Sequence, residues 1–183
     1  AVQYVKGASD GAESALRAFL EVAPDSARVH GLLASTLLYT GRAAEALGHA
    51  DRAIALDPHP AHRFSDRAEI RLVLGHPEGA RSDFARAARI DPEDARVQMG
   101  LLWMRLQDGD LPGAAEHARR AFVLAPSDAF VRLRVGLLWL EAGAYRPALE
   151  SFQDAVRLRP DFELAQMRLA IEYARVGRVE AAR

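Results

Sequence analysis

The stretch ARVQMGLLWMRLQDGDLPGAAEHARRAFVLAPSD, residues 95–128, decides the fold. Its first part, 95–108, has no proline and carries apolar residues at a helical period, which predicts an α-helix. Gly109 ends that helix, because a helix C-terminus favours a residue that tolerates positive φ. A second helix is predicted from about Pro112 to Leu124, since proline is tolerated in a first turn and Pro126 prevents extension. The stretch therefore predicts a helix–turn–helix unit.

This unit returns every 34 residues along the chain. Glycine recurs at the end of each predicted first helix, alanine recurs within the second helix, and proline closes the unit. The residues in register are Gly7, Gly41, Gly75, Gly109, Gly143 and Gly177; Ala12, Ala46, Ala80, Ala114, Ala148 and Ala182; and Pro24, Pro58, Pro92, Pro126 and Pro160. A fixed period of this length is the signature of a stacked repeat protein.

Composition narrows the possible function classes. The chain has 183 residues, half of them apolar, so a sizeable core is possible. A net charge of −1 argues against nucleic-acid binding, because the phosphate backbone selects strongly basic surfaces. No apolar run approaches the ~18 residues of a membrane-spanning helix, so no membrane insertion is expected. The absence of cysteine excludes disulfides, thiolate metal sites and cysteine nucleophiles.

The spacing and the recurring small residues resemble the tetratricopeptide repeat, a 34-residue helix–turn–helix. The matches are small residues at position eight of the first helix, two alanines on the second helix and the closing proline. They are Ala34, Ala68, Gly136 and Ala170; Ala46, Ala80, Ala114 and Ala148; and Ala53, Ala87, Ala121 and Ala155. The family tryptophan at position four is replaced by His30, Phe64, Gln98, Arg132 and Gln166. The resemblance covers the whole chain.

This resemblance implies an all-α fold, a right-handed superhelical array (α-solenoid) of 34-residue helix–turn–helix repeats with about ten helices. Residues 1–183 are predicted to form one array, with complete repeats at 27–60, 61–94, 95–128 and 129–162. Residues 1–26 are expected to hold the tail of a first helix and a second helix. Residues 163–183 are expected to hold a first helix and the start of a second, so the chain is expected to be a piece of a longer array.

In this family the first helices line a concave groove, and the C-terminal half of that groove is mainly apolar here. We therefore expect a peptide-binding site, with the groove residues Met99, Trp103, Leu106, Phe130, Leu133, Leu137, Leu140, Met167 and Ile171. Core packing, or cover by flanking segments or a second copy, is the alternative reading of the same stripe. Trp103 is expected to face the groove, whereas Trp139 occupies a packing position.

Two arginines border the apolar stretch. Arg134 and Arg168 both occupy position six, one repeat apart. A guanidinium binds a carboxylate through two parallel hydrogen bonds, so these residues are candidate carboxylate anchors, solvated arginines being the alternative. The family clamp for a C-terminal carboxylate needs lysine and asparagine on first helices. It is absent, because the chain has no asparagine and Lys6 is its only lysine.

One charged pair is expected to be structural. Arg67 occupies a position of the first helix that is normally apolar, and Asp83 lies on the second helix of the same repeat. Some family members combine arginine and aspartate in this way. Because an unpaired buried guanidinium is costly, the two side chains are predicted to pair.

The sequence offers no constellation for catalysis. The six histidines are scattered without a carboxylate that completes a metal set, and neither a glycine-rich phosphate loop nor HExxH occurs. No enzyme activity, cofactor or metal is therefore expected.

A protein–protein interaction scaffold is the leading hypothesis, with another protein or a peptide segment as partner. The alternatives are the regulatory or substrate-selecting arm of a larger enzyme and a structural part of a bacterial envelope or secretion assembly. Self-association is a further expectation, through apolar residues at the two ends. These are Leu16, Phe19 and Leu20, and Leu169 and Tyr173. The sequence leaves the compartment open between cytoplasm and periplasm.

Overall fold

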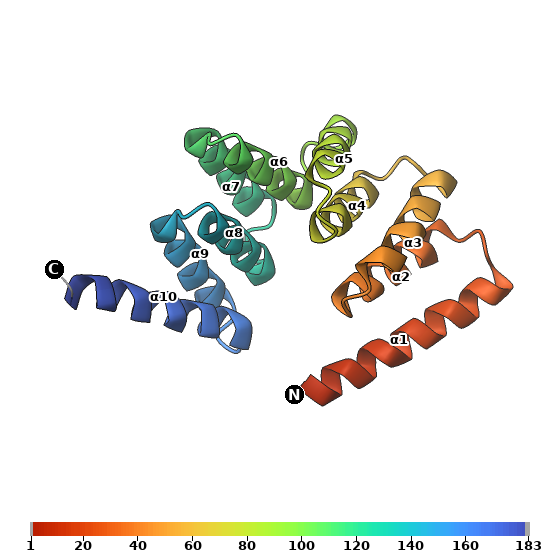
Figure 1. The fold of residues 1–183 in the computed structure, drawn as a ribbon, viewed down its shortest axis with the longest axis horizontal. Helices are drawn as coiled ribbons and strands as arrows, with labels where there is room; N and C mark the ends of the chain where they lie inside the picture. The colour runs from red at the N-terminus through yellow and green to blue at the C-terminus, as the bar shows by residue number, and fades with distance from the viewer. Residues whose placement is uncertain (1, 182–183) are drawn as a thin grey trace. The chain divides into compact units, whose positions relative to one another are not determined.

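The fold is all-α, as the sequence predicted. A computed structural model describes the backbone of residues 2–181 and the side chains of residues 11–175. This part of the chain forms ten helices and no strand (Figure 1). The helices are α1 (Val2–Val22), α2 (Ala27–Tyr39), α3 (Ala43–Leu56), α4 (Ala61–Val73), α5 (Pro77–Ile90), α6 (Ala95–Gln107), α7 (Leu111–Leu124), α8 (Ala129–Glu141), α9 (Tyr145–Leu158) and α10 (Glu163–Ala181).

The chain divides into two compact units, Ala1–Pro92 and Glu93–Arg183. In the first unit, α2 pairs with α3 and α4 pairs with α5, while α1 packs on α2 and α3 packs on α4. In the second unit, α6 pairs with α7 and α8 pairs with α9. There α6 and α7 also contact α8, and α10 packs against α9. Each unit is thus a short stack of helical hairpins.

Turn residues set the helix ends. The glycine that follows each of the first helices α2, α4, α6 and α8 has positive φ, for example 72° at Gly109. Only glycine adopts this conformation without a steric penalty, so the chain reverses there. The next first helix is capped by the turn that precedes it. Asp94 Oδ1 accepts the backbone N–H of Arg96 at 2.7 Å, and Asp128 Oδ1 accepts that of Phe130 at 2.8 Å.

Two glycines of the same series do not end a helix. The expected break within residues 1–26 is absent, because α1 runs without interruption from Val2 to Val22 across Gly7. Likewise α10 continues across Gly177 to Ala181. Glycine permits positive φ but does not impose it, and a glycine inside a helix costs only about 1 kcal/mol. The other glycines reverse the chain where a second helix packs back on the first.

The core of each hairpin lies where small side chains let two helices approach. The second-helix alanines Ala46, Ala80, Ala114 and Ala148 are all fully buried. In the second unit, Gly136 of α8 faces Phe152 of α9, which is also fully buried. A Cβ atom at residue 136 would lie 2.5 Å from the Phe152 ring. The packing here therefore requires glycine.

Three of the five residues that replace the family tryptophan share one role. His30 Nε2 lies 2.9 Å from the Pro24 carbonyl oxygen, and Arg132 Nη2 donates to that of Pro126 at 3.3 Å. Gln166 donates to the Pro160 carbonyl in the same way. Each partner is the closing proline six residues earlier. These three polar side chains at position four therefore tie their first helices to the preceding turn. The constant spacing of six residues from the closing proline is a signal that the sequence contains.

The predicted pairing of Arg67 with Asp83 is confirmed. The Arg67 guanidinium donates two hydrogen bonds to the Asp83 carboxylate, at 2.9 and 2.7 Å, and a third at 2.7 Å to Asp51 of α3. Arg71 adds a bond of 2.7 Å to Asp83. These hydrogen bonds raise the pKa of Arg67 although its burial opposes the charge. The buried Asp83 is thus fully compensated, and α3, α4 and α5 are joined.

A pair of histidines links α2 and α3. His30 Nδ1 and His49 Nδ1 lie 2.9 Å apart. Because the Pro24 carbonyl can only accept, His30 Nε2 carries the proton there, and His30 Nδ1 accepts from His49. Burial, followed by the charges of His30 and Arg17, lowers the pKa of His49, and Glu45 opposes the shift. Burial likewise lowers the pKa of His117, which is bonded to Gln98 at 2.8 Å.

We expect Gly136→Ala to destabilise the protein by about 1–3 kcal/mol, the usual cost of overpacking a core. The control is Gly31→Ala in α2, where an added Cβ meets no atom within 4 Å. That change should be neutral or stabilising by about 0.5–1 kcal/mol, because alanine favours the helix. Urea unfolding curves of the two variants measure the difference. Equal stability would contradict the close packing of α8 on α9.

The lowered pKa values of His49 and His117 predict that the free energy of unfolding falls as the pH decreases. The folded-state pKa of His49 lies below its ordinary value of 6.5, so the folded protein binds the proton less readily than the unfolded chain. The stabilisation is fully present above pH 6.5 and is lost as the pH falls through the lower, folded-state pKa. His49→Gln, which cannot titrate, should weaken this dependence in urea unfolding between about pH 7.5 and 5.5. Identical pH profiles for the wild type and His49→Gln would refute the assignment.

Candidate functional site

Three of the expected groove residues are buried, which corrects the sequence interpretation of their exposure. Met99 of α6 and Leu133 of α8 belong to the core of the second unit, with 6% and 1% of their surface exposed. Trp103 is 7% exposed, almost the same as Trp139 at 5%. The helices α6 and α8 pack side by side, so side chains between them become core. The expected contrast between Trp103 and Trp139 in exposure is therefore wrong.

A second group of the expected groove residues is half-buried. Leu106 of α6 and Leu137 and Leu140 of α8 pack against the core of the second unit and keep part of their surface open. Because these three side chains are only partly exposed, they contribute less to an open apolar surface than exposed residues do.

The third group is exposed. Phe130 of α8 and Met167 and Ile171 of α10 have 50%, 51% and 46% of their surface open, and Leu164 of α10 has 41%. We call these four residues the α8–α10 face. On α10 the three apolar side chains are spaced at i, i+3 and i+7, which places them on one side of the helix. A different side of α10 is buried through Ala165 and Glu172.

The two candidate anchors have different surroundings. Arg134 is half-buried, and its guanidinium carbon lies 5.9 Å from the centre of the Phe130 ring. Arg168 is also half-buried, and its Nε is closed off from solvent without a hydrogen-bond acceptor. Arg134 therefore lies beside the exposed aromatic ring of the face, whereas the Nε of Arg168 is enclosed.

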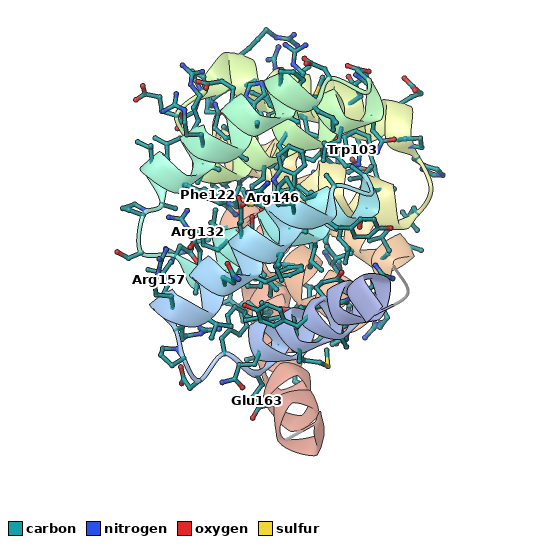
Figure 2. All side chains as sticks on the ribbon, turned by 90° about the vertical axis from the view of Figure 1, so that its left-hand side faces the viewer. Trp103, Phe122, Arg132, Arg146, Arg157 and Glu163 are labelled. Atoms are coloured by element: carbon teal, nitrogen blue, oxygen red, sulfur yellow. The ribbon has the colours of Figure 1, made fainter. Side chains whose placement is uncertain are left out.

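Sequence reasoning missed a third arginine, Arg132 of α8. Its guanidinium carbon lies 3.9 Å from the centre of the Phe122 ring, and Figure 2 labels both side chains. Arg132 Nε is 3.9 Å from the Asp154 carboxylate, and both Nε and Nη1 are enclosed without an acceptor. Burial lowers the pKa of this guanidinium, with Asp154 opposing the shift. The signal available in the sequence was the place of Arg132 at position four, where the family has tryptophan.

The residues expected to support self-association are only partly open. Leu16 and Leu20 of α1 pack against the core of the first unit, and Leu169 of α10 packs against that of the second. Phe19 and Tyr173 are about half exposed, and the Tyr173 hydroxyl bonds to Gln153 at 2.7 Å. Self-association stays a prediction.

The described side chains do not assemble a metal site. No group of three or more histidine, aspartate or glutamate residues among residues 11–175 has the geometry to hold an ion. Among the described helices, none combines the length and apolar character needed to cross a bilayer.

Solved structures share this fold. A thermophilic TPR protein from Thermus thermophilus, TTC0263, superposes with a TM-score of 0.80 at 21% identity over 94% of each chain. YrrB, described as a TPR protein with an unusual peptide-binding site, gives 0.55 at 21% identity over 89% of this chain and 84% of its own. The human IFIT1 dimer with m7Gppp-AAAA gives 0.77 at 18% identity, over 92% of this chain and 42% of that one. At these identities the likeness concerns the fold.

A family model matches the sequence directly. The model of the tetratricopeptide repeat matches residues 3–60 and 65–129, which is more than half of the chain. No protein of curated function matches the sequence of this chain. The family assignment thus has two supports, the sequence match and the hairpin repeats of both units, and we conclude that this chain belongs to the tetratricopeptide repeat family.

Proposed function

We propose that this protein binds an apolar segment of another protein on the α8–α10 face. Proteins of the tetratricopeptide repeat family are in general scaffolds for protein interactions. The observation that carries the finer proposal is the exposure of Phe130, Met167 and Ile171 at positions that line the groove in this family. In the groove of this family these side chains would share one surface, and exposed apolar side chains that gather in this way are typical of an interaction site.

The chemistry of the face suits a segment that brings its own apolar side chains. Phenylalanine offers a large rigid surface, and methionine adapts to partners of different shape. The half-buried Leu137 and Leu140 hold α8 in place beneath this surface. The first unit differs at the equivalent positions, since position two is Arg28 in α2 and His62 in α4. A partner that is apolar along its length therefore favours the second unit.

The test is selection of short peptides from a displayed library on the full chain, followed by affinity measurements on variants. Phe130→Ala and Ile171→Ser should weaken the selected peptides by about 2 kcal/mol or more if these residues are hot spots. The free energy of unfolding of both variants should stay within about 0.5 kcal/mol of the wild-type value, because the side chains are exposed. Val73→Ser, at an exposed apolar residue of α4, is the matched control and should not change binding. Selected peptides that bind both variants of the face as tightly as the wild type would refute the proposed site.

A further inference from the structure

A cavity of about 540 Å³, widely open to solvent, lies at the start of α8. Three segments of the second unit form it: the turn Ala125–Asp128, the first residues of α8 and the residues Leu158 and Arg159 at the end of α9. Phe130 lines this cavity and is therefore common to the cavity and to the α8–α10 face.

The walls of the cavity are apolar on two sides. Phe130 and Leu158 keep 50% and 40% of their surface open although both side chains are hydrophobic. An apolar side chain from a partner would remove this surface from water, which stabilises a complex by about 25 cal/mol for each Å² buried.

A guanidinium stands beside these walls. The Arg159 guanidinium carbon lies 3.8 Å from the centre of the Phe162 ring, so stacking fixes its position. Arg159 forms no ion pair within the described part of the chain. The acidic residue in the cavity wall, Asp128, is engaged as a helix cap by the N–H groups of Phe130 and Val131. The cavity therefore presents a positioned cation that forms no ion pair with a carboxylate of the described residues, and the Asp128 carboxylate lies in the same wall.

The corresponding turn of the first unit has the opposite character. Two repeats earlier in the chain, Phe130 corresponds to His62, and Arg159 corresponds to Asp91. In the other complete repeats the position of Arg159 holds Asp57, Asp91 or Ala125, and Asp57 pairs with Arg63. The combination of an exposed aromatic ring and a cation is therefore a property of this repeat and not of the fold.

We propose that this cavity receives an acidic side chain of the bound segment, with the carboxylate on Arg159 and a neighbouring apolar side chain on Phe130 and Leu158. The inference rests on the proposed function and specifies its partner as an apolar segment that carries aspartate or glutamate. Arginine suits this task, because its planar donors match the two oxygens of a carboxylate.

The experiment selects short peptides, displayed without a free C-terminus, on the wild type and on Arg159→Gln and Arg157→Gln. Arg157 is the matched control, since it lies on the same turn of α9, is largely exposed and pairs with Asp154. Peptides from the wild type and Arg157→Gln should be enriched in aspartate or glutamate next to an apolar residue. Peptides from Arg159→Gln should keep the apolar residue and lose the acidic enrichment.

Affinities then separate the two proposals. Arg159→Gln, or Glu→Gln in a selected peptide, should weaken binding about fivefold, and the two changes together should cost no more than one alone. Equal acidic enrichment on the wild type and on Arg159→Gln would overturn the inference. If Arg159→Gln leaves the affinity unchanged while Phe130→Ala and Ile171→Ser weaken it, the inference is overturned and the proposed function stands.

Discussion

The close approach of two helices at alanine and glycine is the constraint on which the rest of the structure depends. Ala114 and Ala148 are fully buried on the second helices of the two hairpins in the second unit, and Gly136 admits the ring of Phe152. Leu102 and Phe152, which are fully buried in the same core, supply the bulk that these small side chains lack. The pairing leaves the outer sides of the helices free to vary, which suits a fold used as a scaffold.

Local rules predicted the elements well, because each depends on residues near in sequence. The recurrence of Gly41, Gly75, Gly109 and Gly143 placed the chain reversals, and the structure has positive φ at all four. The pairing of Arg67 with Asp83 was also predictable, since two residues of one hairpin face each other whatever the neighbouring repeats do. The family followed from the same period.

The candidate site was predicted less well, because exposure depends on how neighbouring layers pack. Leu133 and Met167 occupy the same repeat position, yet one is buried between first helices and the other is exposed on α10. The repeat position fixes the direction of a side chain, whereas the next layer decides whether that direction leads to solvent. Gly7 and Gly177 show the same limit for the backbone, since a permissive residue reverses the chain only where packing requires it. The role of Arg132 depended on reading position four together with the proline six residues before it.

In the proposed complex, the first helices α8 and α10 of the second unit carry the partner surface. Amide hydrogen exchange of the full chain, with and without a selected peptide at saturation, tests this claim most directly. We expect slower exchange in residues 126–141 and 163–175, where the face and the turn before α8 lie, with little change in the second helices α7 and α9. Protection confined to α7 and α9, or to helices of the first unit, would contradict it.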